Sequence, residues 1–307
     1  MIEKGFAVQS NLIMQLKIFL TGATGYIGGA IADAAIGAGH PLVGLARSDD
    51  AARKLSDKGI TAHRGDLTSP ATLAAAARSA EAVIHTGTTN DGALDREAVR
   101  AMLAAVDGSG KPFIYTSGVW VLGDTRGRVV DETAQLNPLP KVAWRPGVEQ
   151  MVLDAARQNV RSIVIRPGVV YGRGGGIPAE LVQSARETGA ARYVGTGENH
   201  WPMIHLADLA DLYLRALENA PAGTLLHAAD DTRLRVKEIA EAASIGAGAG
   251  GRTISWPLED ARKTLGAYAD ALVLDQQVSA EKARVTLGWA PKEPSVIDDL
   301  KSGSYTK

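Results

Sequence analysis

Short apolar runs alternate with helix-like stretches over the first 165 residues of the chain. The short runs predict buried strands, and the longer stretches between them have the spacing of amphipathic helices. Strands that alternate with helices form right-handed βαβ crossovers, so the pattern predicts an α/β fold with a parallel sheet covered on both faces. The predicted strands are residues 16–20, 41–46, 60–63, 82–85, 112–116 and 162–165, and the predicted helices include 27–38, 70–78 and 96–106.

From about residue 166 the pattern becomes less regular and richer in loops. The glycine-rich segments 172–178 and 244–251 are typical of flexible connections. We therefore predict that residues 167–307 form mainly a smaller C-terminal lobe that closes over the carboxyl edge of the sheet. Some elements of this half are expected to be interleaved with the first and to complete the sheet.

The first fifteen residues mix polar and charged residues with apolar ones and lack the hydrophobic block of a signal peptide. We expect either that Met14 is the natural start of the chain or that residues 1–15 are a loosely held extension. No apolar run approaches the ~20 residues that a membrane span needs. These features predict a cytoplasmic protein without membrane contact.

Composition and charge exclude several classes of protein. The 307 residues are 45% hydrophobic and 22% charged, which excludes a disordered chain. With 33 basic and 34 acidic residues the net charge is −1, so no nucleic-acid partner is expected. The absence of cysteine excludes disulfides, thiolate catalysis and cysteine-bound zinc. His200 and His205 are separated by Trp201-Pro202 and do not share a helical face, so no metal site is predicted.

The most informative motif follows the first strand, where residues 21–29 read TGATGYIGG. Between them, Gly22, Gly25 and Gly28 would permit a tight turn, let the backbone approach a pyrophosphate, and let the next helix pack on the strand. The pyrophosphate would then lie at the positive N-terminus of that helix. The motif predicts that residues 16–166 form a Rossmann-like dinucleotide-binding domain with a doubly wound parallel sheet.

The end of the second strand bears on the choice of cofactor. Ala46 stands where an NAD site usually places a carboxylate for the ribose hydroxyls, and Arg47 and Ser48 follow it. A guanidinium and a hydroxyl suit a 2′-phosphate, so NADP is favoured. The alternative is a solvated Arg47 with Asp49 or Asp50 in the ribose role, which leaves NAD open.

In these residues and in several further motifs, the chain resembles the extended short-chain dehydrogenase/reductases, the NAD-dependent epimerase/dehydratase family. The resemblance covers nearly the whole length, and it implies the family's fold and cofactor contacts. It is carried by the motifs at 21–29, GDL at 65–67, VIHTG at 83–87, YTS at 115–117, RPGVVYG at 166–172, IHLADLA at 204–210 and LGWAP at 287–291. The implied cofactor-binding residues, with those from the second strand, are Gly22, Thr24, Gly25, Tyr26, Ile27, Gly28, Arg47, Ser48, Asp66, Leu67, Thr86, Gly87, Thr116, Pro167, Val169 and Val170.

The chain departs from the family at its catalytic motif, a Tyr-x-x-x-Lys pair on a helix with a Ser or Thr after the fifth strand. Lys141 stands at the tyrosine position and Arg145 at the lysine position, while Gly118 takes the hydroxyl position with Ser117 one residue early. Pro146 is favoured in the first turn of a helix and disfavours a helical residue before it. We therefore expect the helix to begin at Pro146, with residues 141–145 as its lead-in loop.

Four residues are candidates for the catalytic work. Arg145 stays protonated and can stabilise an oxyanion but cannot relay a proton, whereas Lys141 can donate one. Ser117 follows the strand directly and is placed to touch cofactor or substrate, and Tyr171 is the nearest phenol that survives. Alternatively, Lys141 and Arg145 are solvated cations in a loop, and Ser117 is an ordinary hydroxyl at the end of a strand. Trp120 and Trp144 are candidates for apolar substrate walls or for core packing.

Three functions are compatible with these features. The first is an NADP-dependent reductase or dehydrogenase of a small carbonyl substrate, and the second is a non-catalytic NADP-binding sensor or regulatory module. The third is a nucleotide-sugar epimerase, which ranks last because the acid/base pair is missing and no Arg lies between Gly195 and the 204–210 motif. The expected partner is a small molecule, and a homodimer is left open.

Overall fold

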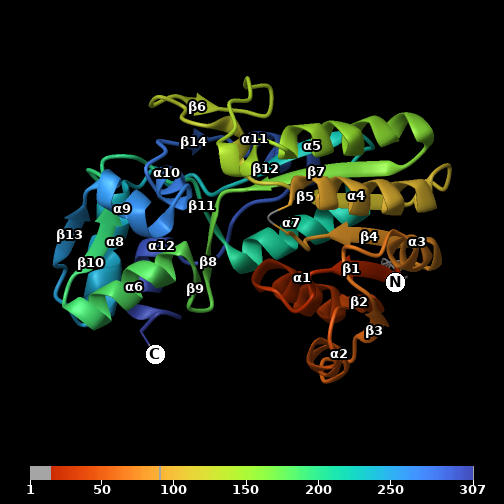
Figure 1. Cartoon of the computed structure of the whole chain (residues 1–307), viewed down its shortest axis with the longest axis horizontal. Coiled ribbons are helices and arrows are strands. Elements are labelled where there is room, and N and C mark those ends of the chain that lie inside the picture. The colour runs from red at the N-terminus through yellow and green to blue at the C-terminus, as the bar shows by residue number, and fades with distance from the viewer. Residues whose placement is uncertain (1–14, 90, 307) are drawn as a thin grey trace, which may run out of the picture.

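The computed structural model describes residues 15–89 and 91–306, so all of the predicted extension except Gln15 lies outside the described residues. Its largest sheet has seven parallel strands in the order β12-β7-β5-β4-β1-β2-β3 (Figure 1). The order runs outward in both directions from the neighbours β1 and β4, so the predicted doubly wound, Rossmann-like fold is confirmed. The strands are β1 (Ile18–Thr21), β2 (Leu42–Ala46), β3 (Thr61–Arg64), β4 (Ala82–His85), β5 (Pro112–Thr116), β7 (Arg161–Pro167) and β12 (Thr224–Ala228).

Helices cover both faces of this sheet because its strands alternate apolar side chains to each side (Figure 1). Ile18 and Leu20 of β1 belong to the core under α1 and α7, and Phe19 between them belongs to the core under α3, α4 and α5. Among the described residues, no helix has the length and apolar character to cross a membrane. The helices are α1 (Tyr26–Gly37), α2 (Asp49–Ser56), α3 (Pro70–Ser79), α4 (Gly92–Val106), α5 (Arg145–Asp154) and α7 (Leu206–Asn219).

The predicted elements agree closely with the observed ones. β4 and β5 begin and end where predicted, and the other four predicted strands agree within two residues. Three elements of the sheet and its covering helices were not predicted, α2, α7 and β12. In α2 only Leu55 is buried, so the helix lacks a strong apolar stripe. β12, from the second half of the chain, is the edge strand beside β7.

The second half also builds a lobe with its own core, formed mainly by three helices that pack on one another (Figure 1). These helices are α6 (Ile177–Thr188), α8 (Val236–Gly246) and α12 (Val296–Ser302). The remaining elements are β6 (Val129–Val130), β8 (Val169–Gly172), β9 (Gly175–Gly176), β10 (Ala191–Val194), β11 (Met203–His205), β13 (Thr253–Trp256), α9 (Leu258–Leu265), α10 (Tyr268–Leu272), β14 (Gln277–Val278) and α11 (Glu281–Leu287).

The glycine-rich connection that starts at Gly172 ties the two parts of the molecule together. Tyr26 of α1 donates its hydroxyl hydrogen to the Gly172 carbonyl at 2.7 Å, and the Gly172 amide donates to the Tyr305 hydroxyl at 2.9 Å. Arg173 forms an ion pair with Asp33 of α1 at 2.7 Å. The connection is therefore anchored to the first turns of α1, next to the glycine motif.

A buried ion pair links α5 to the sheet. Arg166 of β7 donates from Nε to Glu149 Oε1 at 2.9 Å and from Nη2 to Oε2 at 2.5 Å. Both side chains are 3% exposed, so neither charge is compensated by solvent. His227 lies beside the pair, and burial together with the Arg166 charge lowers its pKa to about 3, which keeps the imidazole neutral. The pair fixes the position of α5, whose first turn reaches the candidate site.

We expect Arg166→Met to lower the free energy of unfolding by about 3–5 kcal/mol, because it leaves the Glu149 carboxylate buried without a partner. The double variant Arg166→Met/Glu149→Leu should recover most of this loss, since it removes both charges. Urea denaturation at pH 7 measures both values. A single variant as stable as the unmodified protein would contradict this account of the pair.

Candidate functional site

Strand β1 ends in the predicted glycine turn, whose backbone is held by very close contacts. Gly22 has φ of 73°, which favours glycine, and its carbonyl accepts a hydrogen bond from the Gly25 amide at 2.8 Å. A Cβ on Gly28 would lie 2.1 Å from the Gly22 carbonyl oxygen and 2.6 Å from Thr86 Oγ1. α1 begins at Tyr26 without a side-chain cap on its N-terminus, so the amides of its first turn can bind an anion.

A hydrogen-bond network holds the end of β4 against this turn. Thr86 Oγ1 donates to the Thr21 carbonyl at 2.7 Å, and the Gly87 amide donates to Thr21 Oγ1 at 3.0 Å. His85 lies 2.7 Å from Thr21 Oγ1 through Nδ1 and 3.3 Å from Asp95 Oδ1 through Nε2. Neither Thr21 nor Asp95 was predicted as a site residue. A polar residue at the end of an apolar strand, such as Thr21 in β1, can indicate a hydrogen-bond network of this kind.

At the end of β2, Arg47 and Ser48 lie at the same edge of the sheet as the glycine turn. Ser48 Oγ accepts from the Ala51 amide at 3.1 Å and caps α2, which leaves its hydroxyl hydrogen available to a ligand. Arg47 is exposed, and no acidic residue in the described part of the chain pairs with it. Both residues therefore lie at the carboxyl edge of the sheet, at the start of α2.

Both carboxylates that were the alternative for the ribose are engaged elsewhere. Asp49 forms an ion pair with Arg64 at the end of β3. Asp50 pairs with Lys54 one turn along α2 at 2.7 Å, and the hydrogen bond from Lys54 lowers the pKa of this carboxyl. Their positions in the first turn of α2 favour these pairs with cations and with the helix dipole.

The loop after β3 contains Asp66 and Leu67, which were predicted as cofactor-binding residues. Asp66 Oδ1 accepts from the Thr68 amide at 2.8 Å and from the Thr68 hydroxyl, which lowers the pKa of Asp66. Leu67 is half-buried against the core under α3 and α4. Asp66 is therefore anionic and exposed at the sheet edge, with its second oxygen available to a ligand.

A cavity of about 280 Å³ opens at the carboxyl edge of the sheet and adjoins the glycine turn through Ile27. It brings together Ser117, Lys141 and Arg145, three of the four predicted catalytic residues, and the predicted cofactor residues Pro167, Val169 and Val170. Trp120 and Trp144 form part of its wall. The other lining residues are Thr88, Thr89, Gly118, Val119, Val142, Gly168 and Ile177.

The polar groups in the cavity have few partners. Ser117 is 6% exposed, and its hydroxyl oxygen makes no hydrogen bond with the described residues. Arg145 donates from Nη1 to the Thr116 carbonyl at 3.2 Å and lies 5.1 Å from the centre of the Trp144 ring, while its buried Nε has no partner there. Lys141 is exposed at the rim. The Ser117 hydroxyl and the Arg145 Nε therefore keep a hydrogen-bonding capacity that the described residues do not use.

The prediction that the helix begins at Pro146 was wrong by one residue. Arg145 is the first residue of α5, Trp144 before it has helical backbone angles, and Lys141 lies in a short 3₁₀ turn (Pro140–Val142). A proline only disfavours a helical residue before it. The contacts of Arg145 with Thr116 and the Trp144 ring offset this cost.

Tyr171 is not brought to the cavity. It is buried in the core of the second lobe, where its hydroxyl donates to the Pro294 carbonyl at 2.8 Å and its ring meets the His205 ring edge-on. Burial raises its pKa above the ordinary tyrosine value, which opposes ionisation. Its phenol is already committed to a structural hydrogen bond, so Tyr171 has no role in the site we describe.

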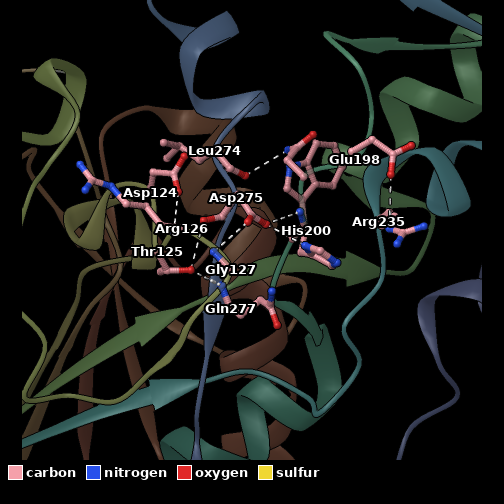
Figure 2. Close-up of polar contacts among 12 residues, drawn as sticks. Asp124, Thr125, Arg126, Gly127, Glu198, His200, Arg235, Leu274, Asp275 and Gln277 are labelled. Atoms are coloured by element: carbon pink, nitrogen blue, oxygen red, sulfur yellow. Dashed lines mark hydrogen bonds and ion pairs between the residues drawn. The ribbon is translucent and has the colours of Figure 1, made fainter.

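A segment from the far end of the chain supports the cavity wall. The Asp275 carboxylate accepts from the His200 amide at 2.9 Å and the Gly127 amide at 3.1 Å, as Figure 2 shows. Burial alone would raise the pKa of Asp275, but the hydrogen bonds from His200 hold it below its usual value. The neighbouring Gln276 is buried, and its amide donates to the Val119 and Gly123 carbonyls at 2.8 Å each. Sequence reasoning missed this segment.

The model of the NAD dependent epimerase/dehydratase family matches residues 18–227, about two thirds of the chain. The chain belongs to the NAD dependent epimerase/dehydratase family. Its match covers the glycine turn, the cavity and strand β12. The resemblance to this family that the sequence indicated is therefore confirmed.

Curated relatives and solved structures of this family member resemble it over most of its length. The Saccharomyces cerevisiae protein "Uncharacterized protein YLL056C" is 33% identical over 94% of this chain and 98% of its own. A Stigmatella aurantiaca protein named as a 4-hydroxy-2-methyl-3-oxo-4-farnesyl-3,4-dihydroquinoline-1-oxide ketoreductase is 26% identical over 72% of this chain and 70% of its own. Among solved structures, a Thermus thermophilus UDP-glucose 4-epimerase in complex with NAD has a TM-score of 0.76 at 18% identity, covering 93% of this chain and 99% of that one.

A nicotinamide dinucleotide fits the residues of this epimerase/dehydratase family member. A Cβ on Gly22 would lie 2.6 Å from Thr86 Oγ1, so the turn keeps a bare backbone that a pyrophosphate can approach. The unpartnered Ser117 hydroxyl lies in the cavity that begins beside this turn. Gly22, Gly25 and Gly28 with the first turn of α1 would hold the pyrophosphate.

We expect Gln276→Leu to lower the free energy of unfolding by about 2–4 kcal/mol, because it leaves the Val119 and Gly123 carbonyls without their donor in a buried place. The leucine has a similar volume, so the change tests the hydrogen bonds rather than the packing. The melting temperature and a urea titration measure the loss. Gln277→Leu, at the neighbouring half-buried position, is the matched control, and equal effects of the two changes would contradict the assignment.

Proposed function

We propose that the protein is an NADP-dependent reductase of a small carbonyl compound in which Ser117, Lys141 and Arg145 replace the family's tyrosine and lysine. The observation that carries the proposal is the cavity itself. It joins the glycine turn to one buried, unpartnered hydroxyl and two cations, and it is otherwise walled mainly by apolar side chains. The ketoreductase name of the Stigmatella aurantiaca relative supports this class of reaction.

Each polar residue has a distinct task in the proposed reaction. The Ser117 hydroxyl donates a hydrogen bond to the carbonyl oxygen and orients the substrate. Lys141 gives a proton to this oxygen as negative charge develops on it, and solvent reprotonates the amine because Lys141 lies at the exposed rim. Arg145 stays protonated and stabilises negative charge from a fixed position. The bound cofactor supplies the hydride that reduces the carbonyl carbon, so the products are an alcohol and the oxidised cofactor.

The choice of NADP rests on the end of β2. Arg47 is exposed and without an acidic partner among the described residues, beside the available Ser48 hydroxyl. Asp49 and Asp50 are engaged with Arg64 and Lys54, which weakens the case for an NAD-type ribose contact. A guanidinium and a hydroxyl at this place suit a 2′-phosphate.

We expect the protein to bind NADPH at least tenfold more tightly than NADH, and Arg47→Ala to remove most of this preference. The lost contact, a hydrogen bond between two charged groups, is worth ~1.5–3 kcal/mol. Fluorescence titration with both cofactors measures the four affinities. Arg53→Ala, on the exposed face of α2, is the control. Equal affinities in the unmodified protein would contradict the assignment of NADP.

We expect Lys141→Ala to lower kcat by ~10²–10⁴, the usual contribution of a general acid, and Ser117→Ala to reduce turnover as well. Tyr171→Phe should keep most of the activity, because the phenol makes only a structural hydrogen bond. The assay follows NADPH consumption with aldehydes, ketones and imines. If only Tyr171→Phe abolished turnover, the assignment would be wrong. If NADPH bound tightly and nothing were reduced, a non-catalytic NADP-binding module would be the better description.

A further inference from the structure

The cavity holds more positive charge than the reduction of a neutral carbonyl requires. Lys141 and Arg145 both line it, and no Asp or Glu does so among the described residues. Reduction places one negative charge on one oxygen, and a proton from Lys141 cancels it. The charge of Arg145 then remains uncompensated throughout the proposed reaction.

Glu149 and Asp95, which share the surroundings of Tyr115 with Arg145, are already engaged. Glu149, one turn further along α5, holds Arg166 through both carboxylate oxygens. Asp95 is bound by Tyr115 at 3.0 Å and lies 3.3 Å from His85. In the part of the chain that the structure describes, Arg145 makes no ion pair.

The side chain of Arg145 is only partly exposed to solvent. Among the described residues, its buried Nε has no partner, its Nη1 donates to the neutral Thr116 carbonyl, and its guanidinium lies against the Trp144 ring. The ring and the carbonyl attract a cation but do not neutralise it. A partly buried charge without a counter-ion is unfavourable, and a guanidinium with unused donors matches a carboxylate in a two-pronged contact.

We infer that the substrate itself carries the counter-ion, and that it is an oxo acid, with a carboxylate bound by Arg145 and a carbonyl group bound by Ser117 and Lys141. The inference rests on the proposed reductase function and names the substrate class of that site. The remaining wall is mainly apolar, from Val119, Trp120 and other side chains, with Thr88 and Thr89 as its further polar residues, so the rest of the substrate is a hydrocarbon group. A cavity of about 280 Å³ admits only a small one.

The test measures binding and turnover separately. Calorimetry on the NADP⁺ complex compares pentanoate with pentanamide, which differ in charge but not in shape. We expect pentanoate to bind at least tenfold more tightly, and Arg145→Gln to abolish this difference while Arg145→Lys keeps part of it. Arg157→Gln, an exposed arginine further along the helical segment, is the matched control. Initial rates with 2-oxo- and 4-oxopentanoate are compared with those of 2-pentanone and methyl 4-oxopentanoate.

The outcomes separate this inference from the proposed function. A pentanoate preference that depends on Arg145, with faster turnover of an oxo acid than of the neutral ketones, supports both. Turnover of neutral ketones with no preference for carboxylates overturns the inference and leaves the reductase function in place. A preference without any turnover overturns the reductase function. If Arg145→Gln weakens NADPH binding and leaves the pentanoate preference unchanged, Arg145 serves the cofactor and the inference is wrong.

Discussion

Helix α1 approaches the end of strand β1 so closely that no side chain fits at position 28. A Cβ there would overlap the Gly22 carbonyl and the Thr86 hydroxyl. Because of this contact the amides of the first turn of α1 lie at the carboxyl edge of the sheet, next to the point where the chain leaves β1 and β4 toward opposite faces of the sheet. An anion-binding helix end and a crevice between strands therefore coincide. The network of Thr21, Thr86 and Gly87 keeps the backbone on the other side of the crevice in place.

The cavity lies at this edge of the sheet, but the residues that form its walls come from distant parts of the chain. The end of β5 supplies Ser117, the start of α5 supplies Arg145, and the crossing from β7 to β8 supplies the 167–170 backbone. The buried Arg166–Glu149 pair holds α5 to β7, and Gln276 holds the 3₁₀ turn after β5. Each wall is thus fixed by a buried polar contact outside the cavity. This arrangement lets the side chains that line the cavity differ from the family's pattern while the fold is kept.

The sequence predicted what depends on local pattern. The apolar runs of β4 and β5 were placed to the residue, and the glycine spacing indicated the anion-binding turn. Ser117, Lys141 and Arg145 were found because they stand in a motif with fixed spacing. The Gln276 contact was not predictable, since it joins residues more than 150 positions apart and a lone glutamine carries no signal. Tyr171 was a weak candidate because a strand position alone does not tell whether its phenol points into a cavity or, as here, into the core of a second lobe.

We propose that the chain carries out reduction at this cavity although it lacks the family's tyrosine. The most direct measurement uses NADPH with deuterium at the transferable position of the nicotinamide, incubated with the protein and a panel of carbonyl compounds. Mass spectrometry and NMR of the products then locate the label. We expect deuterium on the carbinol carbon of at least one product. Where this carbon is a stereocentre, it should have a single configuration. NADPH that binds at the glycine turn but transfers no deuterium to any carbonyl compound would contradict it.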